Sequence, residues 1–334
     1  MIILRLFCIL GAAGVEWGER VPYLVGRMNP SPLKRDLETC LAEARPAAHE
    51  FSIGHRGACL EFPEHTKESY EAAISQGAGT VECDVAVTAD GEFVCRHSRC
   101  DLDETTNILA TPLAGKCDGT CCTTDITLEE FKSLSGTNDR SCGTLLSHRE
   151  SIELIKSAGR SFAPELKKYR GPLDYDHLRR KLVDEYVAAG VDSSLVQLQS
   201  FDRNDVDFWI REYPQFGSRA VLLDSSKCDG SMAGCPQISN FSAWKASGIN
   251  YYAPSYRSLL GHDNRPSDLA IAAKRAGLEI IAWTIESSRD DKESVVVFEI
   301  LHALAQDVGV RSVFSDWPAT STFYANCQLA GFPS

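Results

Sequence analysis

The chain has 334 residues, of which 43% are hydrophobic and 24% charged, and this globular composition argues against disorder, collagen or a coiled coil. Acidic residues outnumber Lys and Arg by 46 to 34, and the net charge of −12 argues against a protein that wraps nucleic acid. The length suits two domains or one α/β barrel with insertions.

The N-terminus is the first distinct segment. Residues 1–14 contain an apolar run that is broken only by Arg5 and ends in small residues. This pattern predicts a secretory signal peptide, with an ordinary strand or an imperfect gene start as the alternative, and the run is too short to span a membrane. Thirteen cysteines also favour a secreted or extracellular protein, and we expect most of the twelve that follow Cys8 to be paired.

From residue 48 onward, apolar β-rich runs alternate with segments of helical period. The predicted strands are 51–54, 80–87, 161–166, 195–200, 219–223, 250–253, 279–285 and 312–315. The predicted helices are 66–76, 152–158, 174–189, 203–212, 239–246, 267–276 and 292–306. With a last short helix after Pro318, this order predicts an α/β fold, a (β/α)8 TIM barrel over residues 48–327, with a doubly wound sheet as the alternative.

The alternation stops between residues 98 and 150, where five cysteines accompany a single helical patch at 128–134. We interpret this stretch as an insertion after the second strand, stapled by disulfides, that covers the barrel end where the βα loops gather. A structural zinc site is the alternative, but Cys117, Cys121 and Cys122 lack paired C-x2-C knuckles and a matching His pair. Farther along the chain, Cys228 and Cys235 are candidates for a local disulfide.

Charged residues follow or lie on the first two barrel strands. The first strand ends in Gly54-His55-Arg56-Gly57, at the end of a barrel where catalytic groups lie. In the second strand, the period of two places Glu82 and Asp84 on one face. Two buried carboxylates repel each other and lose hydration, and a divalent cation would relieve both costs. The alternative is an exposed edge strand with two solvated acids.

The third strand repeats this arrangement, because Glu165 and Lys167 share one of its faces. Three carboxylates suit Mg²⁺ or Ca²⁺ better than zinc, and Arg56 and Lys167 would hold an anion beside the ion. A Glu165–Lys167 salt bridge within the strand is the alternative. His97 ends another apolar run, and with His55 it forms a plausible acid–base pair for phosphoryl chemistry.

A larger set of motifs extends these strand ends. The set comprises Gly54-His55-Arg56-Gly57-Ala58, Pro63-Glu64-His65-Thr66, Glu82-Cys83-Asp84, Asp90-Gly91, His97, Glu165-Leu166-Lys167, Gln199-Ser200-Phe201-Asp202 and Trp283-Thr284. In this order and spacing the chain resembles the glycerophosphodiester phosphodiesterase family over residues 51–318. The resemblance implies a barrel enzyme that splits small glycerophosphodiesters into sn-glycerol 3-phosphate and an alcohol, with one divalent cation, Mg²⁺ or Ca²⁺.

The resemblance also implies roles for single residues. It implies His55 and His97 as the catalytic acid and base, and Glu82, Asp84 and Glu165 as metal ligands. Arg56 and Lys167 are implied as phosphate contacts, with Trp283 as an aromatic wall beside the substrate. Two positions depart from the usual family pattern: the family usually has Asn where this chain has His65, and Asp where this chain has Ser98.

Two other functions remain open from the sequence. Spider-type sphingomyelinase D enzymes are similar barrels, so a phospholipase that acts on lysophospholipids or sphingomyelin is one alternative. A secreted barrel that binds without turnover is the other. The insertion has no long amphipathic helix with a basic face, and the chain is acidic, so we expect no stable membrane insertion and a preference for soluble diesters over lipids.

Overall fold

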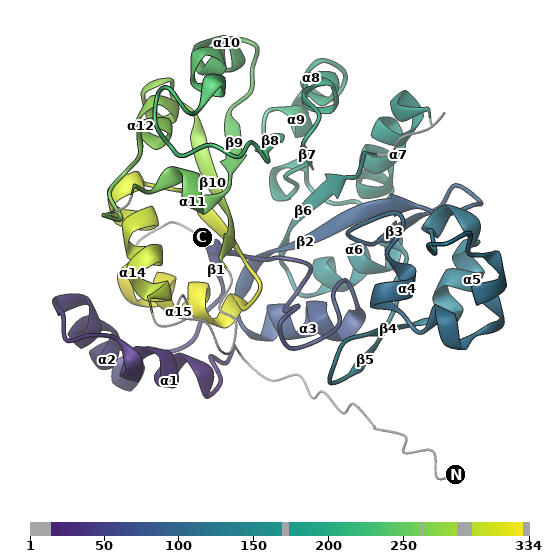
Figure 1. Ribbon diagram of the computed structural model, residues 1–334, viewed down its shortest axis with the longest axis horizontal. Coiled ribbons are helices and arrows are strands. Elements are labelled where there is room, and N and C mark those ends of the chain that lie inside the picture. Colours follow the sequence, from purple (N-terminus) through teal and green to yellow (C-terminus); the bar gives the residue numbers. More distant parts are fainter. Residues whose placement is uncertain (1–14, 169–173, 262, 286–295, 330–334) are drawn as a thin grey trace.

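The computed structural model describes residues 15–168, 174–261, 263–285 and 296–329, so the predicted signal peptide at 1–14 lies outside the described residues. Eight parallel strands form a closed barrel, because the first strand pairs with both the second and the last (Figure 1). They are β1 (His49–Gly54), β2 (Ala78–Val87), β6 (Ser161–Leu166), β7 (Gln199–Ser200), β8 (Val221–Asp224), β9 (Tyr251–Pro254), β10 (Glu279–Ile285) and β11 (Ser312–Ser315). The predicted (β/α)8 barrel is confirmed, and the doubly wound alternative is wrong.

The strand predictions hold to within a few residues, with one shortened strand. The run predicted at 195–200 begins in a 3₁₀ turn, η4 (Ser193–Leu195), and only its last two residues form β7. Inside the barrel, apolar side chains from the strands fill the centre. They are Ile53, Ala163, Val221, Leu223, Ala253, Ile281 and Phe314. This packed interior supports the charged residues that lie nearer the strand ends.

Helices surround the barrel strands (Figure 1). They are α3 (Lys67–Ser75), α6 (His148–Ser157), α7 (Tyr175–Ala188), α8 (Arg203–Glu212), α9 (Pro214–Gly217), η5 (Pro236–Asn240), α10 (Phe241–Ala246), α11 (Tyr256–Leu259), α12 (Asp268–Arg275), α14 (Val297–His302), η6 (Ala303–Val308) and α15 (Pro318–Gln328). Side-chain caps start several of them: Thr66 accepts from the Ser69 amide, and Ser147 forms a capping box with Glu150. The start of the helix predicted at 292–306 lies outside the described residues. None of the described helices is both long and apolar enough to cross a membrane.

Two helices that the sequence analysis did not predict precede the barrel. They are α1 (Arg20–Arg27) and α2 (Pro32–Glu43), and they lie beside α15 in Figure 1. Their buried side chains, including Leu24 and Leu37, join the core that contains α15. The Cys40–Cys327 disulfide fixes α2 to α15. The apolar pattern of this segment was missed because it is short and interrupted by proline.

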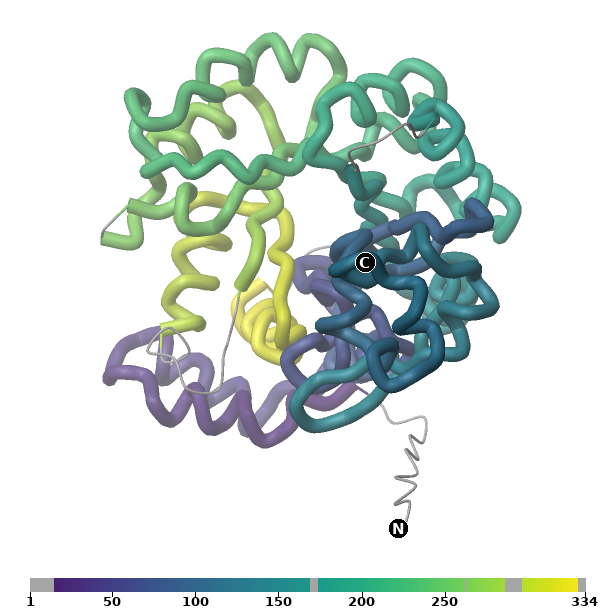
Figure 2. Tube along the Cα trace, turned by 45° about the vertical axis from the view of Figure 1, so that its right-hand side comes forward, coloured from purple at the N-terminus to yellow at the C-terminus, as the bar shows by residue number. Residues whose placement is uncertain are grey.

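The insertion at 98–150 forms a small body beside β3 (Phe93–Cys95), which pairs antiparallel with β2 (Figures 1 and 2). Its elements are α4 (Leu102–Thr105), η1 (Ile108–Ala110), η2 (Pro112–Lys116), η3 (Thr123–Asp125), α5 (Leu128–Ser133), β4 (Ser135–Thr137) and β5 (Cys142–Thr144). It has its own apolar core, in which Leu102, Ile126 and Phe131 pack on Ala86 and Val94 of the β2–β3 hairpin. The insertion is therefore anchored to the side of the barrel.

Five disulfides join ten of the twelve described cysteines. They are Cys40–Cys327, Cys83–Cys95, Cys100–Cys122, Cys117–Cys121 and Cys228–Cys235. The predicted local bridge at Cys228 is confirmed. Because the cysteines considered for zinc are disulfide-bonded, the zinc alternative is wrong. The expectation that all five insertion cysteines staple it is corrected, because Cys142 is a free, exposed thiol; Cys59 is free as well.

Peptide mapping under non-reducing conditions is expected to recover these five pairs. Without denaturant, an alkylating reagent should modify the exposed Cys142 quickly. Cys59 should react slowly, because burial and the nearby Asp316 raise the pKa of its thiol. The measurement is mass spectrometry after timed alkylation, with a reduced and unfolded sample as the reference for full labelling. Rapid labelling of Cys40 or Cys117 would contradict this pattern.

Candidate active site

All eight site residues expected from the sequence line one cavity of about 230 Å³. They come from strands that are far apart in sequence but neighbours in the barrel. The full lining consists of His55, Arg56, Glu82, Asp84, His97, Glu165, Lys167, Gln199, Phe201, Leu223, Trp283, Thr284 and Phe314. The cavity therefore combines a cluster of carboxylates, two cations and two imidazoles with an apolar wall.

The three carboxylates are held on two neighbouring strands. Asp84 and Glu165 are direct partners in the β2–β6 register, and Glu82 lies two residues before Asp84. The β2 strand is buried along its whole length between β1 and β6, so the exposed edge-strand alternative is wrong. Glu82 and Asp84 share one face of β2, as predicted, because both line the cavity. Cys83 between them points to the opposite face, where it forms its disulfide with Cys95.

Hydrogen bonds fix each carboxylate. The backbone N–H of Arg56 donates to Glu82 Oε2 at 2.6 Å. Lys167 Nζ lies 3.2 Å from Asp84 Oδ1 and 2.8 Å from Glu165 Oε1, so the Glu165–Lys167 salt bridge exists but is shared with Asp84. Lys167 thus holds two carboxylates from different strands at one place.

The electrostatics of these carboxylates suit a hard divalent cation. Burial and the charge of Asp84 raise the pKa of Glu165 to about 8, although Lys167 opposes the shift. Burial, Asp84 and Glu165 raise the pKa of Glu82 well above its usual range. Three oxygen donors that repel one another in a cavity match the ligand chemistry of Mg²⁺ or Ca²⁺, whose charge would offset the repulsion.

Arg56 connects this cluster to a second charged group. Its backbone is left-handed, with φ of 56°, which costs roughly 1–2 kcal/mol for a residue other than glycine. Its guanidinium donates to Glu64 Oε2 at 2.7 Å and lies 3.7 Å from Asp84 Oδ2. Despite its burial, Glu64 has a pKa lowered to about 2 by Arg96 and Arg56. Glu64 therefore orients Arg56, a role that the sequence analysis did not assign.

His65 orients Asp84. The side chain of His65 has no solvent exposure; its Nε2 lies 2.9 Å from Asp84 Oδ2 and its Nδ1 lies 3.0 Å from the Tyr70 hydroxyl. Burial lowers the pKa of His65 to about 4, so the imidazole is neutral near pH 7. The network assigns the proton to Nε2, which donates to Asp84 while Tyr70 donates to Nδ1. Because Nε2 is engaged in this way, we interpret His65 as a support for Asp84.

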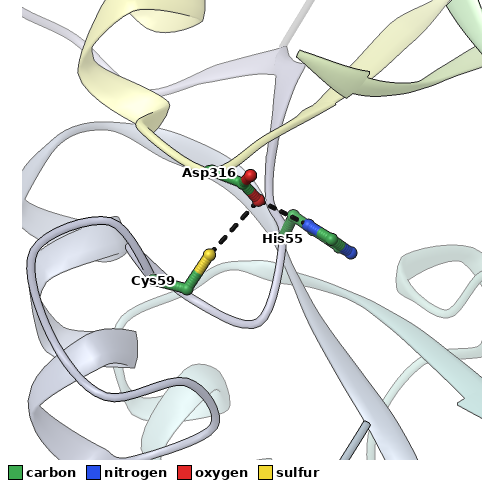
Figure 3. Close-up of side chains that lie close together, drawn as sticks. All are labelled: His55, Cys59 and Asp316. Atoms are coloured by element: carbon green, nitrogen blue, oxygen red, sulfur yellow. Dashed lines mark hydrogen bonds and ion pairs between the residues drawn. The ribbon is translucent and has the colours of Figure 1, made fainter. Parts of the chain in front are cut away.

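The two histidines on the cavity differ in their surroundings. Asp316 directly follows β11, and its Oδ1 lies 2.5 Å from His55 Nδ1 (Figure 3). The Nε2 atom of His55 is therefore on the side of the ring away from Asp316. His97 follows β3 and is exposed. Partial desolvation by the cavity wall, with Arg56 and Lys167 nearby, lowers the pKa of His97 despite the opposing charge of Asp84. Both imidazoles can therefore exchange protons with a molecule in the cavity.

An apolar wall completes the cavity. The Trp283 indole N–H donates to the Ala253 carbonyl at 2.7 Å, which fixes the ring. Trp283 also packs edge to face on Phe201, with ring centroids 6.0 Å apart. Gln199 had no role predicted from the sequence beyond its place in a motif. It is buried in the same lining, and its Oε1 has no hydrogen-bond partner among the described residues. Gln199 thus offers a buried acceptor to a bound molecule.

The insertion contributes less to this site than the sequence analysis expected. No described residue of 98–150 lines the cavity. The reason is packing, because the insertion buries its apolar core against β2 and β3. The insertion therefore lies beside the barrel and does not form the expected cap over the carboxylates. It contacts the buried Arg96, whose guanidinium donates to the Thr105 hydroxyl.

Comparisons with known proteins agree with this geometry. A sequence model of the Glycerophosphoryl diester phosphodiesterase family matches residues 55–320. The chain is 34% identical over 217 residues to an "Extracellular protein" of Arthroderma benhamiae, covering 56% of this chain and 87% of the relative. It is 22% identical over 346 residues to a glycerophosphodiester phosphodiesterase of Haemophilus influenzae, covering 84% of this chain and 91% of the relative.

A solved structure extends the comparison to the fold. A phosphodiesterase of Oleispira antarctica in complex with the product sn-glycerol-3-phosphate aligns with a TM-score of 0.58 at 21% identity. The alignment covers 82% of this chain and 96% of that chain. At this identity the likeness shows a shared barrel fold.

Proposed function

The chain belongs to the glycerophosphoryl diester phosphodiesterase family and is a phosphoric diester hydrolase, and we propose that it splits glycerophosphodiesters into sn-glycerol 3-phosphate and an alcohol by metal-dependent, two-histidine catalysis. The observation that carries the proposal is the single cavity in which three carboxylates, Arg56, Lys167 and both histidines converge. Phosphorus NMR of the products formed from glycerophosphocholine, with and without the divalent ion, tests the proposal.

The carboxylates would hold one Mg²⁺ or Ca²⁺ ion. Glu82, Asp84 and Glu165 supply the oxygen donors, and their positions are fixed by the Arg56 amide, His65 and Lys167. When bound, such an ion polarises the phosphoryl oxygens of the substrate. The guanidinium of Arg56 and the ammonium of Lys167 contact the phosphate and stabilise the negative charge that develops on it.

The two histidines move the protons. With Nδ1 directed at Asp316, His55 presents Nε2 to the cavity, where it takes a proton from the attacking group or gives one to the leaving oxygen. The attacking group is either water, which gives glycerol 3-phosphate directly, or the neighbouring glycerol hydroxyl, which gives a cyclic phosphate that water then opens. His97 performs the opposite transfer from the other side. Trp283 and Phe201 form the wall against which the glycerol or alcohol moiety packs.

Asp316 is a positioning residue in this scheme. Replacing Asp316 with Asn should preserve the shape of the site but disturb the His55 tautomer, so we expect turnover to fall about 10²-fold or more. The measurement is kcat across a pH series, in which the profile of Asp316→Asn should differ in shape from that of wild type. Asp307→Asn, in the π-helical turn η6, is the control. An unchanged pH profile in Asp316→Asn would contradict the positioning role.

The substrate class follows from the small cavity and the charged phosphate contacts. We expect glycerophosphocholine to be turned over faster than lysophosphatidylcholine or sphingomyelin, because the cavity of about 230 Å³ is lined largely by charged side chains, which match a polar, deacylated diester. The measurement is release of water-soluble products from each substrate under the same metal. Faster turnover of the lipids would favour the sphingomyelinase D-like alternative.

Secretion belongs to the same proposal. Ten disulfide-bonded cysteines suit an oxidising compartment, as does the likeness to a relative named an extracellular protein. Detection of the protein in the culture medium of an expressing cell, with its N-terminus sequenced, tests the compartment and the predicted cleavage together.

A further inference from the structure

Three different potential metal-ligand groups lie close together outside the carboxylate cluster, at the Nδ1 side of the His55 ring. They are His55 Nδ1, Cys59 Sγ and Asp316 Oδ1 (Figure 3). Oδ1 lies 2.5 Å from Nδ1 and accepts a hydrogen bond from the thiol at 3.2 Å. One ligand atom from each residue lies within 4.8 Å of the other two. The group is partly shielded, with 19% exposure for the His55 side chain and 12% for that of Asp316.

The backbone holds this group in place. The His55 amide donates to the Ser315 carbonyl at 3.0 Å, and the Leu60 amide donates to the Asp316 carbonyl at 3.3 Å. Between them, Gly57 has a φ of 89°, and a Cβ at that position would lie 2.6 Å from the Ser69 backbone. The loop from β1 therefore carries the imidazole and the thiol to the end of β11 in a fixed conformation.

We propose that His55, Cys59 and Asp316 form a binding site for a thiophilic divalent cation such as Zn²⁺, and that its occupation inhibits the enzyme. One imidazole nitrogen, one thiolate and one carboxylate are ligands that Zn²⁺ takes in tetrahedral sites, with water in the fourth position. The Cys59 thiol, which donates to Asp316 in the metal-free protein, releases its proton to solvent when the ion binds. Bond lengths of about 2.0–2.3 Å place tetrahedral ligands roughly 3.3–3.7 Å apart, so Nδ1 and Oδ1 need to separate by roughly 1 Å. The thiolate distinguishes this site from the carboxylate cluster, which suits hard cations.

Inhibition follows from the chemistry of imidazole, and this step rests on the proposed role of His55. A neutral imidazole has one proton and one free lone pair. When a metal takes the lone pair of Nδ1, the ring proton resides on Nε2, the nitrogen on the cavity side. Nε2 then has no lone pair with which to accept a proton, and Asp316 is removed from its orienting contact. His55 therefore loses its function as a base while the carboxylate cluster stays unchanged.

Two serine variants separate this site from the other free thiol. Cys59→Ser removes the proposed ligand but keeps a hydroxyl that can donate to Asp316, so activity without zinc should be retained. Cys142→Ser removes the exposed thiol in β5, which has no proposed ligand role. The first readout is Zn²⁺ inhibition of turnover at saturating Mg²⁺ or Ca²⁺. Wild type and Cys142→Ser should be inhibited alike, and Cys59→Ser should need at least about tenfold more Zn²⁺.

The second readout does not depend on turnover. Cd²⁺ is titrated into Cys142→Ser, and the ultraviolet charge-transfer absorption of a cadmium thiolate is followed. One equivalent should saturate the signal, and the double variant Cys59→Ser/Cys142→Ser should show none. This titration decides the binding site even if the chain proves to have no phosphodiesterase activity, so the two proposals can fail separately.

Several results would overturn the inference. Equal Zn²⁺ sensitivity of Cys59→Ser and wild type would remove Cys59 from the site. Relief of inhibition by excess Mg²⁺ or Ca²⁺ would place Zn²⁺ on the carboxylate cluster. Absence of the cadmium signal in Cys142→Ser would show that the three donors do not take a thiophilic ion.

Discussion

Replacing His55 or His97 with alanine is expected to lower turnover of glycerophosphocholine by about 10²–10⁴-fold, because each removal deletes a positioned acid or base. The two variants should not be additive, since one transition state requires both proton transfers. His55→Ala also leaves the Asp316 carboxylate without the imidazole that it contacts at 2.5 Å. The loss in kcat should therefore be at least as large for His55 as for the exposed His97.

The measurement is steady-state turnover of the purified variants at saturating metal. His177→Ala is the matched control, because His177 is exposed on α7 and does not line the cavity. Thermal unfolding should agree between wild type, His97→Ala and His177→Ala. Near-native turnover in either cavity variant would remove that residue from the proposed mechanism.

Removing the carboxylates is expected to abolish metal binding as well as activity. Asp84→Asn should have the largest effect, because Asp84 contacts Lys167 and His65 and is the direct β-sheet partner of Glu165. Loss of groups that only support a metal ligand usually costs about 10–100-fold in metal affinity or activity, so loss of a ligand should cost at least about 100-fold. Glu82→Gln and Glu165→Gln should follow the same direction.

Isothermal titration with Mg²⁺ and Ca²⁺ after chelation measures this loss directly. The isosteric control is Glu153→Gln, which removes an exposed carboxylate from α6. Chelated wild-type protein should be inactive and should recover when the preferred ion is returned. Full activity after exhaustive chelation, or unchanged ion affinity in Asp84→Asn, would contradict a metal site at these residues.

Most barrel strands and the positions of several site residues could be predicted from the sequence, because both depend on local periodicity. A period of two was enough to place Glu82 and Asp84 on one face of β2, and to bring Lys167, the residue directly after β6, to the same side as Glu165. The alternation of strands with helical segments then implied that all these strand ends converge. The family resemblance supplied the role of Trp283, which periodicity alone leaves undefined, and it agreed with the acid–base role already inferred for His97 from its position at the end of a strand.

The supporting contacts were not visible in the sequence because they join segments distant in the chain. Asp316 lies 261 residues from His55, and only the adjacency of β1 and β11 brings the two together. Glu64 and His65 were visible as motif letters, but their partners Arg96 and Asp84 depend on how the loop after β1 folds back. The lateral position of the insertion depends on its apolar core against β2 and β3. That core could not be predicted because the apolar residues of the insertion follow neither a helical nor a strand period.

Product analysis of glycerophosphocholine hydrolysis tests the central claim most directly. Phosphorus NMR, run with and without the divalent ion, distinguishes the two P–O bonds that the enzyme could break. We expect glycerol 3-phosphate and free choline, formed only with the ion and absent from reactions of His55→Ala and Asp84→Asn. Formation of choline phosphate and glycerol, or metal-independent turnover that persists in both variants, would contradict the proposed active site.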